Sequence, residues 1–80
     1  MTDLIIYGRP GCQACSLTIR KAEALGLDFA YINVDADIAA AAQLIAAGQR
    51  TLPLVRTPAA EWDGFRPDLL DQLGADRAAQ

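Results

Sequence analysis

Cys12 and Cys15 are the residues of this 80-residue chain whose type and spacing point most directly to chemistry. They form a C-x-x-C motif that follows an apolar run and opens a segment with helical spacing, so we expect a loop leading from a strand into a helix. A thiol at a helix N-terminus lies among free backbone N–H groups at the positive end of the helix dipole, and both favour the nucleophilic thiolate. The second thiol lies one turn along on the same face, close enough to form a disulfide. The motif therefore predicts a redox-active pair.

Two other interpretations of the cysteines remain open. They could be buried core residues, although the glycine- and proline-rich loop around them argues against this. They could instead bind iron–sulfur or zinc, but one C-x-x-C supplies two of four ligands and the chain has no histidine. A metal site within one copy of the chain is therefore not expected.

Length and composition favour a small globular domain spanning residues 1–80. The net charge of −3 and the scattered basic residues argue against a nucleic-acid surface. No stretch has the roughly 20 apolar residues that span a bilayer, and the N-terminus does not resemble a signal peptide. These features predict a cytoplasmic protein without membrane contact, in a compartment where C-x-x-C pairs are more often catalytic or metal-binding than structural.

The first half of the chain has the pattern of a strand–helix–strand unit. Residues 3–7 form an apolar strand expected to be buried on both faces, and residues 13–25 a helix whose inward stripe is Cys15, Ile19 and Ala22. Residues 29–34 form a second strand, parallel to the first. A further helix, capped by Asp35 or Asp37, runs to about residue 47. Its expected buried stripe is Ile38, Ala41, Ala42 and Ile45.

The second half predicts a hairpin followed by a helix. Residues 54–56 form the third strand and residues 59–62 the fourth. Pro53 at the entry to an apolar strand suggests a tight turn with a cis peptide bond. Pro67 fits the first position of a helix whose buried face is Leu69, Leu70 and Leu73, while residues 75–80 are expected to fray.

The resulting order is β-α-β-α-β-β-α. Two parallel strands followed by an antiparallel hairpin give a four-stranded mixed sheet flanked by three helices. This is the thioredoxin-like α/β arrangement, in the small form that lacks an extra N-terminal strand and helix.

Three motifs in this order carry a resemblance to a known family. Tyr7-Gly8-Arg9-Pro10 before the cysteines and Thr51-Leu52-Pro53 before an apolar strand resemble the glutaredoxins. The run Trp62-Asp63-Gly64-Phe65-Arg66-Pro67-Asp68 resembles the Trp-Ser-Gly-Phe-Arg-Pro-Asp motif of the NrdH-redoxins, with Asp63 in the serine position. Two departures are Gln13-Ala14 between the cysteines, where the family more often has Val-Gln, and Leu52 for the usual valine.

The resemblance implies a protein-disulfide reductase that acts as an electron donor. Such proteins accept electrons from thioredoxin reductase, an NADPH-dependent flavoprotein, and pass them to class Ib ribonucleotide reductase, so no cofactor bound to the chain itself is expected. By position, Cys12 is the attacking thiol and Cys15 the resolving thiol. Pro53 is the cis-proline facing them, and Leu52 offers its backbone to the substrate. A monomer is expected.

The remaining motif residues are candidates for contact with the partner. They are Arg9, Pro10, Thr51, Trp62, Gly64, Phe65 and Arg66. Trp62 and Phe65 are equally compatible with a place in the core, and Arg66 with an ordinary surface charge. A glutathione-dependent glutaredoxin is the main alternative function. It is opposed by the run from Trp62, which replaces the segment that binds glutathione in glutaredoxins.

Overall fold

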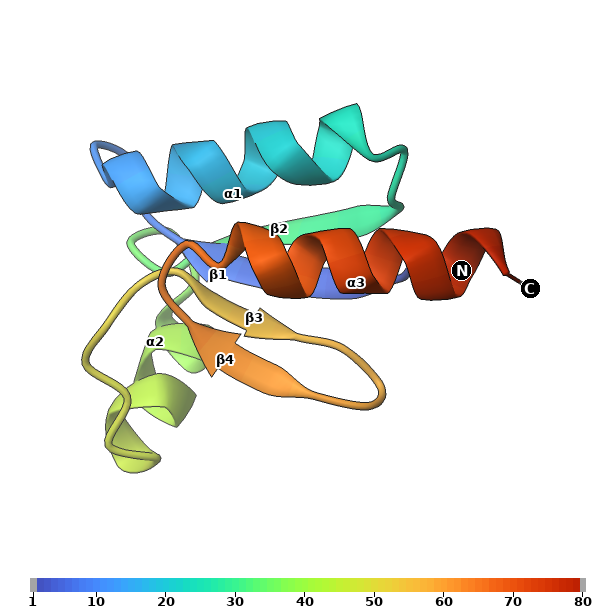
Figure 1. The fold of residues 1–80 in the computed structure, drawn as a ribbon. Coiled ribbons are helices and arrows are strands. Elements are labelled where there is room, and N and C mark those ends of the chain that lie inside the picture. Colours follow the sequence, from blue (N-terminus) through green and yellow to red (C-terminus); the bar gives the residue numbers. More distant parts are fainter. Residues whose placement is uncertain (1, 80) are drawn as a thin grey trace.

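The computed structural model describes residues 2–79, which form four strands and three helices (Figure 1). Their order is the predicted β-α-β-α-β-β-α. The elements are β1 (Leu4–Gly8), α1 (Gln13–Ala24), β2 (Phe29–Asn33), α2 (Ile38–Ala46), β3 (Leu54–Arg56), β4 (Glu61–Asp63) and α3 (Pro67–Ala78). Among these described residues, no helix is both long and apolar enough to cross a membrane.

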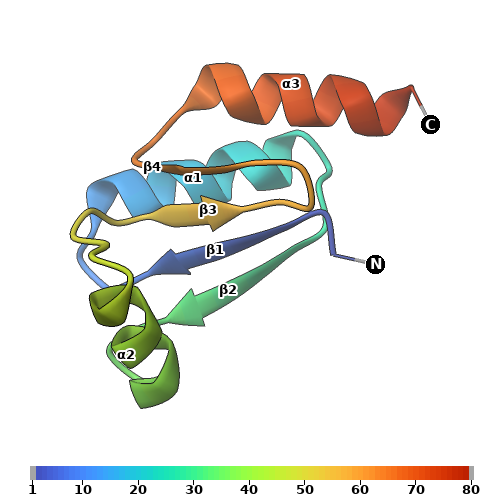
Figure 2. The ribbon, with the colours of Figure 1, turned by 90° about the horizontal axis from the view of Figure 1, so that it is seen from below.

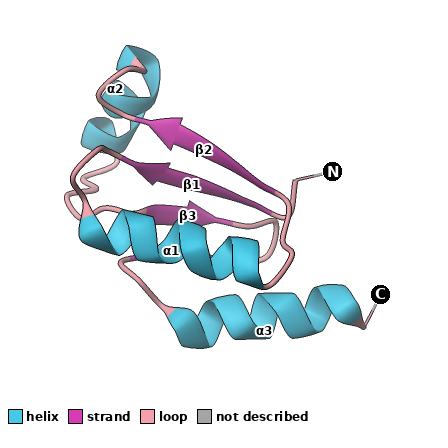
Figure 3. Cartoon of the chain, turned by 90° about the horizontal axis from the view of Figure 1, so that it is seen from above, coloured by secondary structure: helices cyan, strands magenta, loops and turns pink. Residues whose placement is uncertain are grey.

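The sheet has the strand order β2-β1-β3-β4. β1 pairs with β2 in parallel and with β3 antiparallel, and β3 pairs antiparallel with β4. The predicted mixed sheet is therefore confirmed. α1 and α3 lie on one side of the sheet and α2 on the other, near the end of β1 that leads into α1 (Figures 2 and 3).

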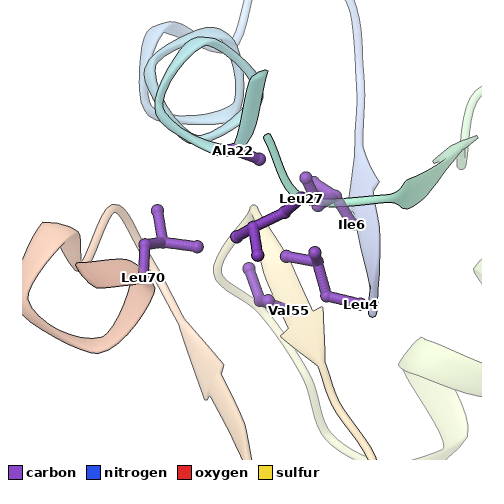
Figure 4. Packing of buried hydrophobic residues seen from close by; sticks show 6 residues of the cluster. All are labelled: Leu4, Ile6, Ala22, Leu27, Val55 and Leu70. Atoms are coloured by element: carbon purple, nitrogen blue, oxygen red, sulfur yellow. The ribbon is translucent and has the colours of Figure 1, made fainter. Parts of the chain in front are cut away.

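The face covered by α1 and α3 holds the larger core cluster (Figure 4). Alternate residues of β1, Leu4 and Ile6, point to this face and meet Leu70 of α3. The other buried members are Ala22, Leu27 and Val55. The predicted inward stripe of α1 is confirmed for Cys15 and Ala22, with Ile19 half-buried.

Thr18 is also fully buried on α1, which the apolar stripe did not predict. Its hydroxyl donates a hydrogen bond to the carbonyl of Ala14 at 2.8 Å. A polar side chain can therefore join this face because the helix itself supplies its acceptor.

The predicted buried stripe of α2 was wrong, because the helix is rotated so that other residues face the sheet. The buried residues are Ala40 and Leu44, whereas Ile38 is 86% exposed and Ile45 75% exposed. Of the other two residues of the predicted stripe, Ala41 is half-buried and Ala42 is exposed. Nearly every residue of this helix is apolar, so the sequence offers no polar face to fix its rotation. Asp37 begins the helix by accepting a hydrogen bond from the N–H of Ala40, and the rotation that follows is decided by packing.

Two boundaries differ from the prediction by two residues or more, and the others agree to within one residue. β4 begins at Glu61 rather than residue 59, because the Thr57 hydroxyl accepts hydrogen bonds from the N–H groups of Ala59 and Ala60 and holds them in a turn. α3 continues to Ala78 where fraying was expected from residue 75. Arg77 anchors this last turn by donating to the Gly26 carbonyl at 2.7 Å and pairing with Asp3 at 2.9 Å. Gln80, within the predicted tail, lies outside the described residues.

Candidate active site

Cys12 and Cys15 form a disulfide at the start of α1, with their Cα atoms 5.2 Å apart. Cys12 is the N-cap of the helix, and its sulfur accepts a hydrogen bond from the N–H of Cys15 at 3.2 Å. Gly11, with a φ of 81°, makes the turn that brings the chain from β1 into this cap. In the reduced protein, the same N–H and the helix dipole would stabilise a Cys12 thiolate.

The two sulfurs have unequal access to solvent. Cys15 is 2% exposed and packs beneath the helix, whereas Cys12 is only half-buried and lines a cavity. An incoming molecule therefore meets Cys12 first. This asymmetry suits one sulfur for attack and the other for an intramolecular second step.

The chain segment at Leu52 and Pro53 lies against the pair. The bond between these two residues is cis, as predicted. The carbonyl oxygen of Leu52 lies 3.9 Å from the sulfur of Cys12. Pro53 is fully buried, and its carbonyl accepts a hydrogen bond from the N–H of Gly64 at 2.9 Å. The loop facing the sulfur is thus fixed to the segment that follows β4.

A cavity of about 230 Å³ opens beside Cys12. Its apolar wall combines Leu52 with Val34 and one side of α2, and its polar rim carries Gln49 and two arginines, Arg9 and Arg50. The α2 residues in this wall are Ala41, Leu44 and Ile45. The cavity can hold an apolar segment with a polar or acidic group at its edge.

Arg9 projects from the exposed loop before Cys12. Its Nε lies 3.4 Å from the Asp35 carboxylate, and both side chains are about half exposed. Pro10 is exposed on the same loop, and Thr51 is exposed beside the cavity. The Thr51 carbonyl accepts a hydrogen bond from the Gln49 side chain at 2.8 Å.

Comparisons with known proteins agree with this geometry. The glutaredoxin family model matches residues 4–57. The glutaredoxin-like protein NrdH of Escherichia coli K12 is 44% identical over 88% of this chain and 86% of its own length. The chain belongs to the glutaredoxin family, among the NrdH-redoxins. The corresponding protein of Salmonella typhimurium is 41% identical over 89% of this chain and 88% of its own.

A solved structure supports the same assignment. It is the structure of the glutaredoxin-like protein NrdH-redoxin from Escherichia coli, which has a thioredoxin-like activity profile. That structure aligns with a TM-score of 0.82, covering 88% of this chain and 92% of the other, at 44% identity. As a member of this family with a C-x-x-C pair, the chain is a dithiol oxidoreductase.

The run from Trp62 to Asp68, which begins in β4, is divided between the active-site loop and the core. Gly64, with a φ of 79°, reaches the active-site loop through its hydrogen bond to Pro53. Trp62 and Phe65 instead pack against the core cluster beneath α1 and α3. The indole Nε1 of Trp62 is buried without a protein hydrogen-bond acceptor among residues 2–79. These two aromatic rings help to build the fold.

Arg66 and Asp68 pair with each other at the start of α3. The guanidinium of Arg66 donates two hydrogen bonds to the Asp68 carboxylate, at 3.2 and 3.0 Å. This pairing lowers the pKa of Asp68 below its ordinary value and raises that of Arg66. Arg66 does not line the cavity beside Cys12, so the structure does not bring it together with the cysteines.

Six of the residues that line the cavity were not predicted as site residues. They are Val34, Ala41, Leu44, Ile45, Gln49 and Arg50. Gln49 and Arg50 directly precede Thr51, so their place in the same loop was available from the sequence. The α2 residues were not, because their part in the cavity follows from the rotation of that helix. Within residues 2–79, no group of three or more His, Cys, Asp or Glu side chains is arranged to hold a metal ion.

Proposed function

We propose that this chain is an electron carrier that is reduced by thioredoxin reductase and reduces the disulfide of class Ib ribonucleotide reductase. The observation that carries the proposal is the unequal pair: Cys12 at the cavity and Cys15 buried behind it. The NrdH-redoxin membership supplies the choice of partners. The chain then needs no cofactor of its own, because NADPH and the flavoprotein reductase provide the electrons. A carrier that must return to its reduced form suits the reducing cytoplasm.

The reaction is two successive thiol–disulfide exchanges. The Cys12 thiolate attacks one sulfur of the partner's disulfide; the Cys12–partner bond forms and the partner's second sulfur leaves as a thiolate. Cys15 then loses its proton and attacks the Cys12 sulfur, and the partner's first sulfur leaves as a thiolate. The partner gains two electrons, and the carrier is left with the Cys12–Cys15 disulfide.

The cavity gives the partner's chain a place beside Cys12. Leu52 lies outside the strands, so its backbone N–H and C=O are not committed to the sheet and can pair with an extended segment. Apolar side chains of that segment would contact Leu44 and Ile45, and Arg50 would meet a carboxylate at the rim. We therefore assign partner binding to the loop of residues 49–53 together with the exposed side of α2.

Several groups that the Trp62–Asp68 run could offer to glutathione are already paired within the chain. The N–H of Gly64 is bonded to the Pro53 carbonyl, and the Asp63 carboxylate accepts a hydrogen bond from Gln49 at 3.2 Å. The Arg66–Asp68 pair uses the two remaining charged groups. Binding glutathione here would cost these bonds, which supports protein partners over glutathione.

The test is insulin-disulfide reduction followed as NADPH consumption in two coupled assays. One contains thioredoxin reductase, and the other contains glutathione with glutathione reductase. We expect turnover only with thioredoxin reductase, and then faster reduction of ribonucleotide reductase than of insulin. Turnover only with glutathione would overturn the proposal and favour a glutathione-dependent glutaredoxin.

Cysteine variants provide the controls. Cys12→Ser should abolish turnover in the same assay. Cys15→Ser should accumulate a mixed disulfide between Cys12 and the partner, visible by mass spectrometry. Full-rate protein reduction by Cys15→Ser would contradict the assignment of Cys15 as the resolving thiol.

A further inference from the structure

Gly8, at the end of β1, is packed against the sulfur of Cys15. It is not among the glycines with positive φ, so its backbone conformation is open to other residues. The space is the constraint, because a Cβ at this position would lie 2.9 Å from the Cys15 sulfur and 3.1 Å from the Cys15 Cβ. Real Cβ atoms essentially never approach another atom as closely as 2.9 Å, so the absence of a side chain lets the sulfur pack directly against the strand.

Tyr31 of β2 closes the same space from the edge of the sheet. The point where a Gly8 Cβ would lie is 3.1 Å from Cε1 of Tyr31. The ring edge and the Cys15 sulfur are therefore at most about 6 Å apart, in the range of favourable sulfur–aromatic contacts. Tyr31 pairs in register with Ile6, whose side chain is buried under α1, so both side chains point to that face.

The position of β2 in the sheet bears on how the Cys15 sulfur is covered. β2 is an edge strand, and within residues 2–79 no further strand lies beyond it. Tyr31 is 39% exposed, while Cys15 is only 2% exposed. A large, partly exposed side chain thus lies close to the buried sulfur at this edge of the sheet.

We propose that Tyr31 is a positioning residue whose ring covers the Cys15 sulfur, so that outside disulfides reach Cys12 alone. The role of this covering rests on the proposed function, in which Cys15 must react only in the second exchange. It differs in its evidence, because the covering of Cys15 can be measured without any partner. The aromatic ring does the covering, and its hydroxyl is dispensable.

The test measures the alkylation of Cys15 in a Cys12→Ser background, where no disulfide can form within the chain. The protein is pulsed with iodoacetamide, and modification is quantified by mass spectrometry. Tyr31→Ala should raise the rate at Cys15 by about tenfold, since reactivity follows access to the thiol. Tyr31→Phe should leave the rate unchanged. An unchanged rate in Tyr31→Ala would overturn the proposal, as would a large increase in Tyr31→Phe.

Two further variants separate covering from a general loosening of the fold. Leu17→Ala removes a large side chain of α1 that is 36% exposed, comparable to Tyr31 on β2, and it should not change the alkylation rate at Cys15. Tyr31→Thr keeps a residue suited to a strand and should behave as Tyr31→Ala does, so it serves if the alanine variant folds poorly. Equal increases in Leu17→Ala and Tyr31→Thr would show general loosening and overturn the assignment. If the parent protein showed no turnover with thioredoxin reductase, that result would count against the proposed function. It would not affect the alkylation rates, which test the covering of Cys15 independently.

Discussion

The two faces of the sheet differ in how completely they are covered. On one face, α1 and α3 enclose a cluster in which Ile6, Val55 and Leu70 have no exposed surface. On the other, the nine-residue α2 buries Ala40 and Leu44 and leaves Ile38 and Ile45 largely in solvent. The cavity beside Cys12 lies on this second face. One face therefore forms a closed core and holds Cys15, while the other has a smaller buried cluster and leaves apolar surface open, where we propose that the partner binds.

The largest expected effect is the loss of stability when a buried leucine is removed from each face of the sheet. Leu70→Ala should lower the free energy of unfolding by about 2–5 kcal/mol, because it empties a fully buried site in the larger cluster. Leu44→Ala should cost less, since its surroundings are partly open, but it should slow protein reduction because Leu44 lines the cavity. Urea denaturation and the insulin assay measure the two effects. Equal losses of stability in both variants would remove the proposed difference between the faces.

Removing the cap of α2 should give a smaller loss. Asp37→Ala deletes the hydrogen bond from the Ala40 N–H, at 2.9 Å, and should cost about 1 kcal/mol. Because α2 stands alone on its face, the loss should appear first as faster hydrogen exchange of α2 amides, with those of α1 unchanged. Uniformly faster exchange over both helices would show that α2 is not independent.

A surface variant of α2 sharpens the functional half of the comparison. Ile45→Gln should leave the melting temperature nearly unchanged, because the side chain is already exposed. It should lower kcat/KM for a protein disulfide about fivefold, which is the loss expected when one typical interface contact is removed. The kcat/KM for a small disulfide reagent should not change.

Ile38→Gln is the matched control for this variant. Ile38 is equally apolar and exposed on the same helix, but it does not line the cavity. Equal losses in the two variants would mean that binding depends on the general hydrophobicity of α2 and not on the cavity.

The smallest effect expected concerns pH. The Arg66 hydrogen bonds hold the pKa of Asp68 below its ordinary value, so Asp68 stabilises the fold above the pKa it has in the unfolded chain. That contribution is lost as the pH falls through its folded-state pKa. Asp68→Asn should therefore melt slightly below the parent protein at neutral pH and coincide with it in strong acid. A difference that persists in strong acid would point to another cause.

The sequence determined the order of elements because its signals are local. Caps, glycine stops and apolar runs predicted seven elements in the correct order. The cysteines were placed at a helix start by the apolar run before them and the helical spacing after them, and Asp37 was one of two predicted caps. Even the cis bond before Pro53 was predicted, because a proline there has few compatible geometries.

Only the tertiary structure decided which side chains meet at the cavity. The rotation of α2 could not be predicted from an almost wholly apolar helix, so the predicted stripe placed Ile45 in the core when it lines an open cavity. Similarly, Tyr31 and Cys15 come from different elements, and both lie close to Gly8 only because β2 pairs with β1 and α1 packs over that strand. Such contacts join residues that are far apart in the chain. They are decided by how the elements pack, which local sequence signals do not specify.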